Sequence, residues 1–220
     1  MNDLETHVLE MIGENTDSPD VFTDDSAGMA QIRESLNDAI EEICMVTGSH
    51  KRTYKMPLRK GAHIYRVNFT RGKLAWITGM WLYGKSYRLE QKDFNYFRDT
   101  IPMWLSDTGT PERYCQIGDD TLCLHPAPDG SSDFIEIEAV VIPNRYTEDT
   151  DRIHLRDSFR WAAVKFAVSE YYASRGDAKS ANDWYYQYLV ELGFQEIYPE
   201  TGERAYAMGQ NKNSDSQISA

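Results

Sequence analysis

Two of the chain's three cysteines and one of its five histidines lie within residues 108–130, which read TGTPERYCQIGDDTLCLHPAPDG. Cys115 and Cys123 are eight positions apart, and His125 follows Cys123 by two. A turn at residues 118–120 would place the two thiols opposite each other on a hairpin. Cys123 and His125 would then share one face, because side chains alternate along a strand. Thiolates and imidazoles are zinc ligands, and together they form the nucleophile and base of Cys–His enzymes.

Neither of these chemistries is supported by the neighbouring sequence. Zinc knuckles usually leave two residues between a pair of cysteines so that both thiolates reach one ion, and no fourth ligand lies near this segment. A catalytic thiolate needs a base that a third group orients, and no residue is placed for that role. The remaining residues of the segment are typical of turns, with Pro111, Gly118 and Pro126 at the points where the chain must bend.

We therefore interpret the segment as a β-hairpin with half-buried thiols. We predict that the protein is not an enzyme and has no metal site and no cofactor. The sequence also has no G-x-G-x-x-G, H-E-x-x-H or G-x-S-x-G pattern. A small enzyme built on a metal or nucleophile site at Cys115, Cys123 and His125 remains the distant alternative.

The hairpin lies in a segment whose composition favours strands. Between residues 51 and 142, runs rich in Tyr, Val, Ile, Phe and Trp are interrupted by Gly, Pro or Asp at short intervals. The predicted strands are residues 53–58, 64–69, 75–83, 86–89, 113–117, 121–124 and 134–142. One short helical turn is predicted before Pro102.

Helical periodicity flanks this segment on both sides. Apolar residues recur three and four positions apart over residues 3–14 and 27–46, and again from about 155 to Gly176 and from 177 to Gly193. We predict an α+β protein: N-terminal and C-terminal helices pack as a small helical bundle, with an inserted antiparallel β-region and an extended C-terminal tail. The predicted parts are residues 1–50, 51–144, 145–194 and 195–220.

The formal net charge of −12 is unevenly distributed, with −11 on residues 1–50, +8 on residues 51–113 and −9 on the rest. An acidic total disfavours nucleic acid as the main partner. A basic middle between acidic flanks indicates charge-complementary surfaces between neighbouring copies or partners. Neutralisation of the blocks within one monomer is the alternative.

Membrane association and export are not indicated. No run of about eighteen apolar residues is present, and the N-terminal sequence MNDLETHVLEMIGEN has neither the basic start nor the apolar core of a signal peptide. We expect no membrane partner, synthesis in a cytoplasm, and free thiols in a reducing compartment.

Two surface features favour contacts with other molecules. A loose basic patch contains Arg59, Lys60 and Arg66 and continues to Arg71 and Lys73, with aromatic residues between them. We expect the first three to lie at a subunit interface; nucleic-acid binding by this patch is the alternative. Tyr186 points away from the apolar stripe of the last helix, which suits an interface as well.

The order of the segments carries a family resemblance. In sequence they read SLNDAIEEI, KMPLRKGAHIYRV, TGTPERYCQIGDDTLCLHPAPDG, IEIEAVVIPNRY, TEDTDRIHLRDSF and WAAVKFAVSEYYASRGDAKSANDWYYQYL. Over residues 28–194 this order resembles the adaptor, or head-to-tail connector, proteins of tailed bacteriophages. In that family a helix with an Asn-Asp-Ala-like segment precedes the β-region. A Thr-Pro-x-x-Tyr segment and a Pro-x-Pro turn follow, and the last two helices are joined at Gly-Asp.

The resemblance implies a non-enzymatic virion protein of the neck. Such adaptors form a ring, typically of twelve copies, beneath the portal protein; they extend the DNA channel and dock tail or nozzle proteins. Packaged DNA would pass through without sequence readout. The C-terminal segment would reach into the portal, with contacts from Ile197, Tyr198, Tyr206 and Met208. A head-completion or tail-terminator protein of the same neck is the alternative.

Overall fold

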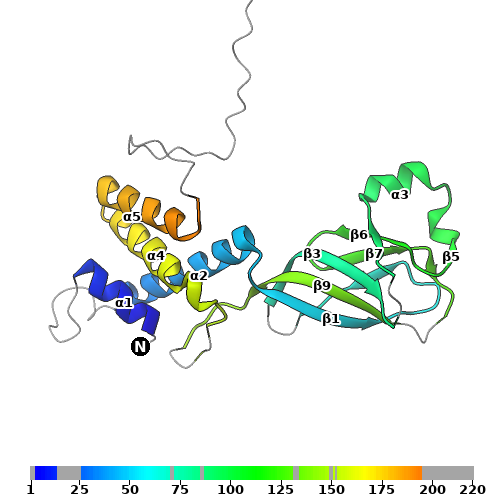
Figure 1. Cartoon of the computed structure of the whole chain (residues 1–220), viewed down its shortest axis with the longest axis horizontal. Helices are drawn as coiled ribbons and strands as arrows, with labels where there is room; N and C mark the ends of the chain where they lie inside the picture. The colour runs from blue at the N-terminus through cyan, green and yellow to red at the C-terminus, as the bar shows by residue number, and fades with distance from the viewer. Residues whose placement is uncertain are drawn as a thin grey trace, which may run out of the picture.

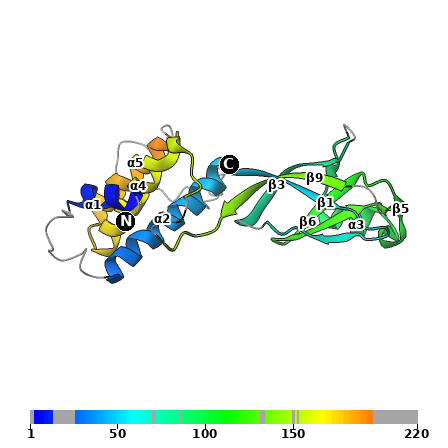
Figure 2. The same ribbon diagram turned by 90° about the horizontal axis from the view of Figure 1, so that it is seen from below.

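The computed structural model describes residues 3–13, 26–69, 72–84, 87–130, 134–148, 151 and 153–194. It shows an elongated molecule in which a helical part and a β part meet at a narrow waist (Figures 1 and 2). Helix α2 (Ser26–Thr47) leads directly into strand β1 (Lys51–Pro57), and strand β9 (Phe134–Pro143) returns the chain to the helices. The predicted α+β class is confirmed.

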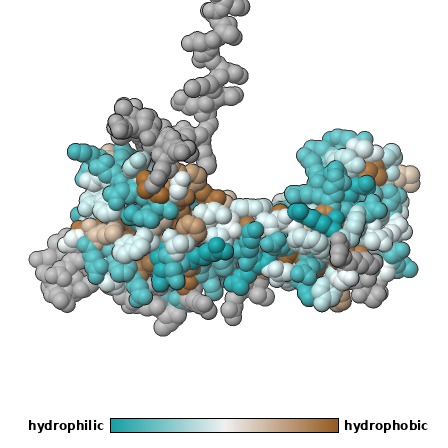
Figure 3. Space-filling view, in the orientation of Figure 1, coloured by the Kyte–Doolittle hydropathy of each residue, from teal (hydrophilic) through white to brown (hydrophobic). Residues whose placement is uncertain are grey.

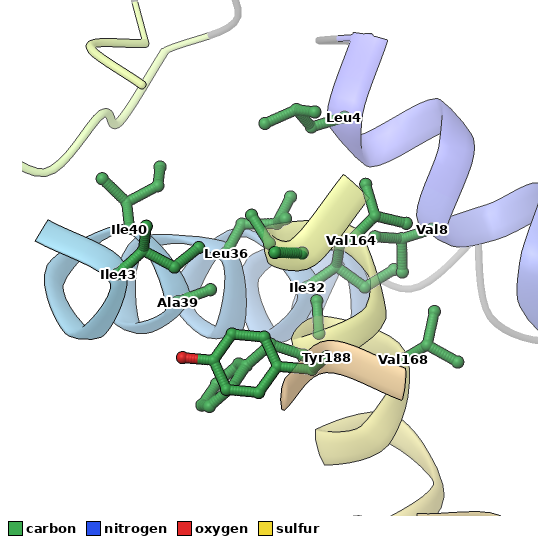
Figure 4. Close-up of a cluster of buried hydrophobic side chains, with 14 of the residues drawn as sticks. Leu4, Val8, Ile32, Leu36, Ala39, Ile40, Ile43, Val164, Val168 and Tyr188 are labelled. Atoms are coloured by element: carbon green, nitrogen blue, oxygen red, sulfur yellow. The ribbon is translucent and has the colours of Figure 1, made fainter. Parts of the chain in front are cut away.

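Four helices share the core of the helical part: α1 (Asp3–Ile12), α2, α4 (Arg160–Ser174) and α5 (Ala178–Glu191). Helix α2 turns one apolar face to this core because its apolar residues recur every three or four positions. The side chains labelled in Figure 4 are Leu4, Val8, Ile32, Leu36, Ala39, Ile40, Ile43, Val164, Val168 and Tyr188. Burial raises the pKa of Tyr188, so its hydroxyl stays protonated and donates to Glu42 Oε1 at 2.9 Å.

The start of the third predicted helix is wrong. Residues 153–156 have no regular secondary structure, a short 3₁₀ turn η2 (Asp157–Phe159) follows, and α4 begins only at Arg160. Leu155 lies at helical spacing from the next apolar residues, but it packs against the helical core from this irregular segment. Apolar spacing reports which side chains are buried, and here it does not report the backbone conformation that buries them.

Two sheets face each other in the β part. The first has the order β1-β9-β3 and is antiparallel throughout, with β3 spanning Gly72–Leu82. The second has the order β2-β7-β6-β4, formed by Ile64–Arg66, Thr121–His125, Arg113–Ile117 and Glu90–Gln91. Alternate residues of both sheets fill the core between them, among them Ile135 and Ile137 of β9 and Leu122 of β7.

Two details differ from the predicted antiparallel strands. Residues 87–89 pair with β3 only through a bridge between Arg88 and Trp81, and the regular strand β4 begins at Glu90, because the chain crosses there to the second sheet. In addition, β4 pairs with β6 in parallel. The two-residue strands β5 (Thr108–Gly109) and β8 (Ala127–Pro128) also pair with each other in parallel.

Candidate functional site

The Cys–His segment forms the predicted hairpin. Strands β6 and β7 place Cys115 directly opposite Cys123. Helix α3 (Phe94–Thr100), which confirms the short helix predicted before Pro102, covers the thiols with Phe97, whose ring also lies 5.8 Å from that of His125. Cys123 and His125 therefore share a face, as predicted. The thiols are fully buried, however, and not half-buried, since α3 closes over them.

The surroundings of these side chains indicate packing. A hydrogen bond with Cys123 lowers the pKa of Cys115, while the same bond and burial raise the pKa of Cys123. The imidazole of His125 is held by Asp107, with 3.1 Å between Nε2 and Oδ2. Within the described part of the chain, no three His, Cys, Asp or Glu side chains are grouped so that they could hold a metal ion.

Sequence reasoning overlooked one phosphate-binding pattern. Residues 79–86 read GMWLYGKS and match G-x-x-x-x-G-K-[ST]. That pattern binds phosphate only when its loop lies between a strand and a helix. Here Gly79 lies inside β3, and the residues described after Gly84 lead to strand β4 and not to a helix. The match therefore does not have the structural context of a phosphate loop.

Two hydrogen bonds join helix α2 to the segment that follows β9. The side chain of Asn37 on α2 pairs with the backbone of Tyr146: its Nδ2 donates to the carbonyl oxygen, and its Oδ1 accepts from the amide nitrogen, both at 3.0 Å. Both residues are buried and Tyr146 belongs to the helical core, so the pair holds the chain that returns from β9 against the middle of α2. The Asn-Asp-Ala segment and the segment that ends in PNRY, two separate elements of the family resemblance, are thus in direct contact.

Next to this pair, three carboxylates line one face of α2. We call Glu34, Asp38 and Glu41 the acidic ridge. A single cation, Arg145, reaches all three, at 3.6 Å from Glu34, 2.5 Å from Asp38 and 3.6 Å from Glu41. The ridge therefore keeps a surplus of two negative charges, and its side chains are 72%, 47% and 40% exposed in the same order.

A basic groove lies where helix α2 leads into strand β1. Residues 49–52 and 153–156 line an open groove of about 310 Å³, which we call the junction groove. Its charged or ionisable lining residues are His50, Lys51, Arg52, His154 and Arg156, and no carboxylate lines it. Sequence reasoning missed this site, because its two walls lie about a hundred residues apart and meet only in the fold.

The two histidines show the electrostatic character of the groove. Their ring centroids are 5.8 Å apart, and Arg52 Nε donates to His50 Nε2 at 3.3 Å. Burial lowers the pKa of His50 below its usual 6.5, and the neighbouring Arg52 and His154 lower it further. With Lys51, Arg52 and Arg156 in its lining and no carboxylate, the groove is suited to bind an anion.

The predicted interface residues do not form one surface. Arg59 and Lys60 are exposed after β1, and Arg66 on β2 lies 3.7 Å from Asp120 in an exposed pair. Tyr186 is 44% exposed on α5, in the other part of the molecule. The predicted portal contacts Ile197, Tyr198, Tyr206 and Met208 lie outside the described residues, as does Arg71.

The chain matches a known protein family. The model of the SU10 adaptor protein family matches residues 3–213, nearly the whole chain. No curated protein matches the chain. Among the described helices, none combines the length and the apolar character needed to cross a membrane.

Proposed function

The chain belongs to the SU10 adaptor protein family, and from this premise we propose that its copies form a ring beneath the portal protein, extend the DNA channel and dock the tail. Membership makes the chain a phage adaptor protein and a component of the virion, in agreement with the order of its sequence motifs. The family match over residues 3–213 is the observation that carries the proposal.

The two-part architecture supports this role. The helical part and the β part have separate hydrophobic cores, and the pair between Asn37 and Tyr146 anchors the segment that returns from β9 to the helical part. A subunit of this kind can contact different neighbours with its two ends while keeping a fixed geometry. Such head-to-tail contacts between unlike surfaces close into rings when the rotation between copies permits.

Exposed apolar side chains on both parts are suited to protein contacts. Met45 and Tyr186 are 48% and 44% exposed on the helical part, and Met103 and Leu105 are 76% and 61% exposed on the β part. On the face shown in Figure 3, hydrophobic residues gather mainly over the helical part. Aromatic residues and methionine are enriched at protein interfaces, so each part has candidate contact groups.

We place the finer contacts as follows. Arg59, Lys60, Arg66 and Tyr186 contact neighbouring copies or the tail. The segment after Phe194 reaches the portal with Ile197, Tyr198, Tyr206 and Met208. The acidic net charge of −12 lets the packaged duplex pass through the ring without strong binding, because phosphates are attracted chiefly to concentrated positive charge.

The test is the mass of the protein alone and after mixing with the portal ring of the same phage, measured by mass photometry. The proposal expects near-stoichiometric addition of copies, in a number that matches the portal. A chain that ends at Phe194 should bind at least tenfold more weakly, while a full-length chain with Lys179→Ala on the exposed face of α5 should bind normally. A full-length protein that ignores the portal but joins purified tails would favour a tail-terminator role.

A further inference from the structure

We propose that the junction groove of one copy binds the acidic ridge of the next, so that these two surfaces form a charge-paired subunit contact. The inference rests on the proposed function, because it requires that copies of this chain meet in an assembly. It adds the identity of the two surfaces, neither of which includes a residue predicted from the sequence to lie at an interface.

The cationic side chains of the groove are largely unpaired with carboxylates among the described residues. Arg52 and Arg156 have no carboxylate within 4 Å among the described residues, and Lys51 approaches only Glu138, at 3.8 Å. Arginine favours flat, two-oxygen acceptors such as carboxylates.

The ridge has the opposite imbalance and a matching length. Its carboxylates lie at helix positions i, i+4 and i+7, on one face and spread over about 10 Å of helix axis. Each wall of the groove is four residues long, a length that reaches about 10 Å when fully extended. One Arg145 serves three carboxylates, so the ridge can accept further cations.

The groove and the ridge of one molecule do not pair with each other, since no ion pair among the described residues joins them. Two different surfaces that complement each other make a head-to-tail contact, which repeats from copy to copy. Charge complementarity of this kind also sets register and excludes wrong partners.

A carboxylate ligand fits better than nucleic acid. No Phe, Tyr or Trp lines the groove to offer a large stacking surface to a base, and the net charge of −12 repels a long polyanion. A compact set of carboxylates on a like copy provides the anion without that penalty.

The test uses two double variants of opposite sign. The groove variant carries Arg52→Glu and Arg156→Glu. The ridge variant carries Glu34→Arg and Glu41→Arg, and keeps Asp38, which holds Arg145 at the waist. All four replaced side chains lie on the surface or are only half-buried, so circular dichroism should show native folding. A control with Arg98→Glu and Lys179→Glu changes the net charge as the groove variant does, at exposed sites elsewhere.

Each variant alone should assemble on the portal at least tenfold more weakly than wild type, because one contact surface now faces a like charge. An equal mixture should recover assembly when the two variants alternate. The reversed, acidic groove of one variant then meets the reversed, basic ridge of the other, and the unchanged ridge of the first meets the unchanged groove of the second. The control should behave as wild type. Normal assembly of either variant alone, or a mixture as weak as its components, would overturn the proposal.

A second measurement does not depend on the portal. Wild-type copies, half of them labelled with ¹⁵N, are treated at high concentration with a carbodiimide, which joins an amine directly to a carboxylate. Mass spectrometry should find light–heavy links from Lys51 to Glu34 or Glu41, and no such links would contradict the contact. A 30-base-pair duplex that binds wild type but not the groove variant, without these links, would assign the groove to phosphate instead.

The experiments distinguish failure of the adaptor ring from failure of the contact between the junction groove and the acidic ridge. If wild type and control both ignore the portal, the adaptor ring is refuted as proposed, while the carbodiimide links still report on the groove and the ridge. If both join the portal and the groove variant does so equally well, only the further inference fails.

Discussion

Replacement of Asn37 by alanine should weaken the contact between α2 and the segment that follows β9 and thereby destabilise the protein. Each of the two hydrogen bonds to Tyr146 contributes about 1 kcal/mol net, and leaving a buried backbone group without a partner costs about 1–3 kcal/mol. Partial entry of water reduces the larger figure, so we expect a loss of about 2–4 kcal/mol in the free energy of unfolding. In a chain of this size, that corresponds to a decrease in Tm of about 5–15 °C.

The assay is urea unfolding followed by circular dichroism, with hydrogen exchange at the amide of Tyr146 as the local readout. Gln31→Ala is the matched control, because Gln31 lies on the exposed face of the same helix; its effect should stay within about 0.5 kcal/mol. A loss from Asn37→Ala no larger than that of the control, or unchanged exchange at Tyr146, would refute the reasoning.

Asn37→Asp separates the two bonds of this pair. An ionised carboxylate still accepts from the amide of Tyr146 but has no hydrogen to donate to its carbonyl oxygen, whereas a protonated one has both a donor and an acceptor. Burial raises the pKa of such a carboxyl in the folded state. The variant should therefore be destabilised at pH 7 and regain stability relative to wild type as the pH falls toward 4. A penalty that is the same at both pH values would argue against donation by the side chain.

Three further predictions concern other parts of the molecule. Phe97→Ala should cost about 3–5 kcal/mol and expose the hairpin thiols to Ellman's reagent; thiols that remain unreactive would show that α3 does not protect them. Gly79→Ala should lower stability by about 1–3 kcal/mol in urea unfolding, because the new Cβ would lie 2.2 Å from Cη2 of Trp81; an unchanged midpoint would mean that the indole moves away without cost. The pKa of His50 is lowered in the folded state, so as the pH falls the imidazole is protonated first in the unfolded chain. The free energy of unfolding therefore decreases as the pH falls from about 6.5 through the folded pKa. His50→Gln should reduce the difference in stability between pH 7.5 and pH 5.5, and a larger difference in the variant would reverse the sign of the argument.

The local elements of this protein follow from its sequence. The spacing of Ile32, Leu36 and Ile43 predicts α2, because a helix returns to the same face every three or four residues. The turn at Gly118 likewise predicts that Cys115 lies opposite Cys123, since a short turn determines the register of a hairpin. Both follow from interactions between residues close in the chain.

The limits of such local information appear at residues 153–156. Leu155 has helical spacing and nevertheless lies outside the helix, because packing against a distant core determines the backbone there. The full burial of the two thiols is a second example. It depends on α3, and sequence spacing does not report which helix covers which face of a hairpin.

The sequence by itself determined the α+β class, the family and most of the helices and strands, because periodicity, turn residues and motif order are local properties of the chain. Only the tertiary structure determines which distant segments of the chain meet. Asn37 meets Tyr146 across 109 positions of sequence, and the walls of the junction groove come from segments just as far apart. The helix and strand propensities of a sequence do not determine which distant backbone group a side chain will bind, nor which charged side chains will lack a partner. Those properties arise only when the chain has folded and its charges are compared in space.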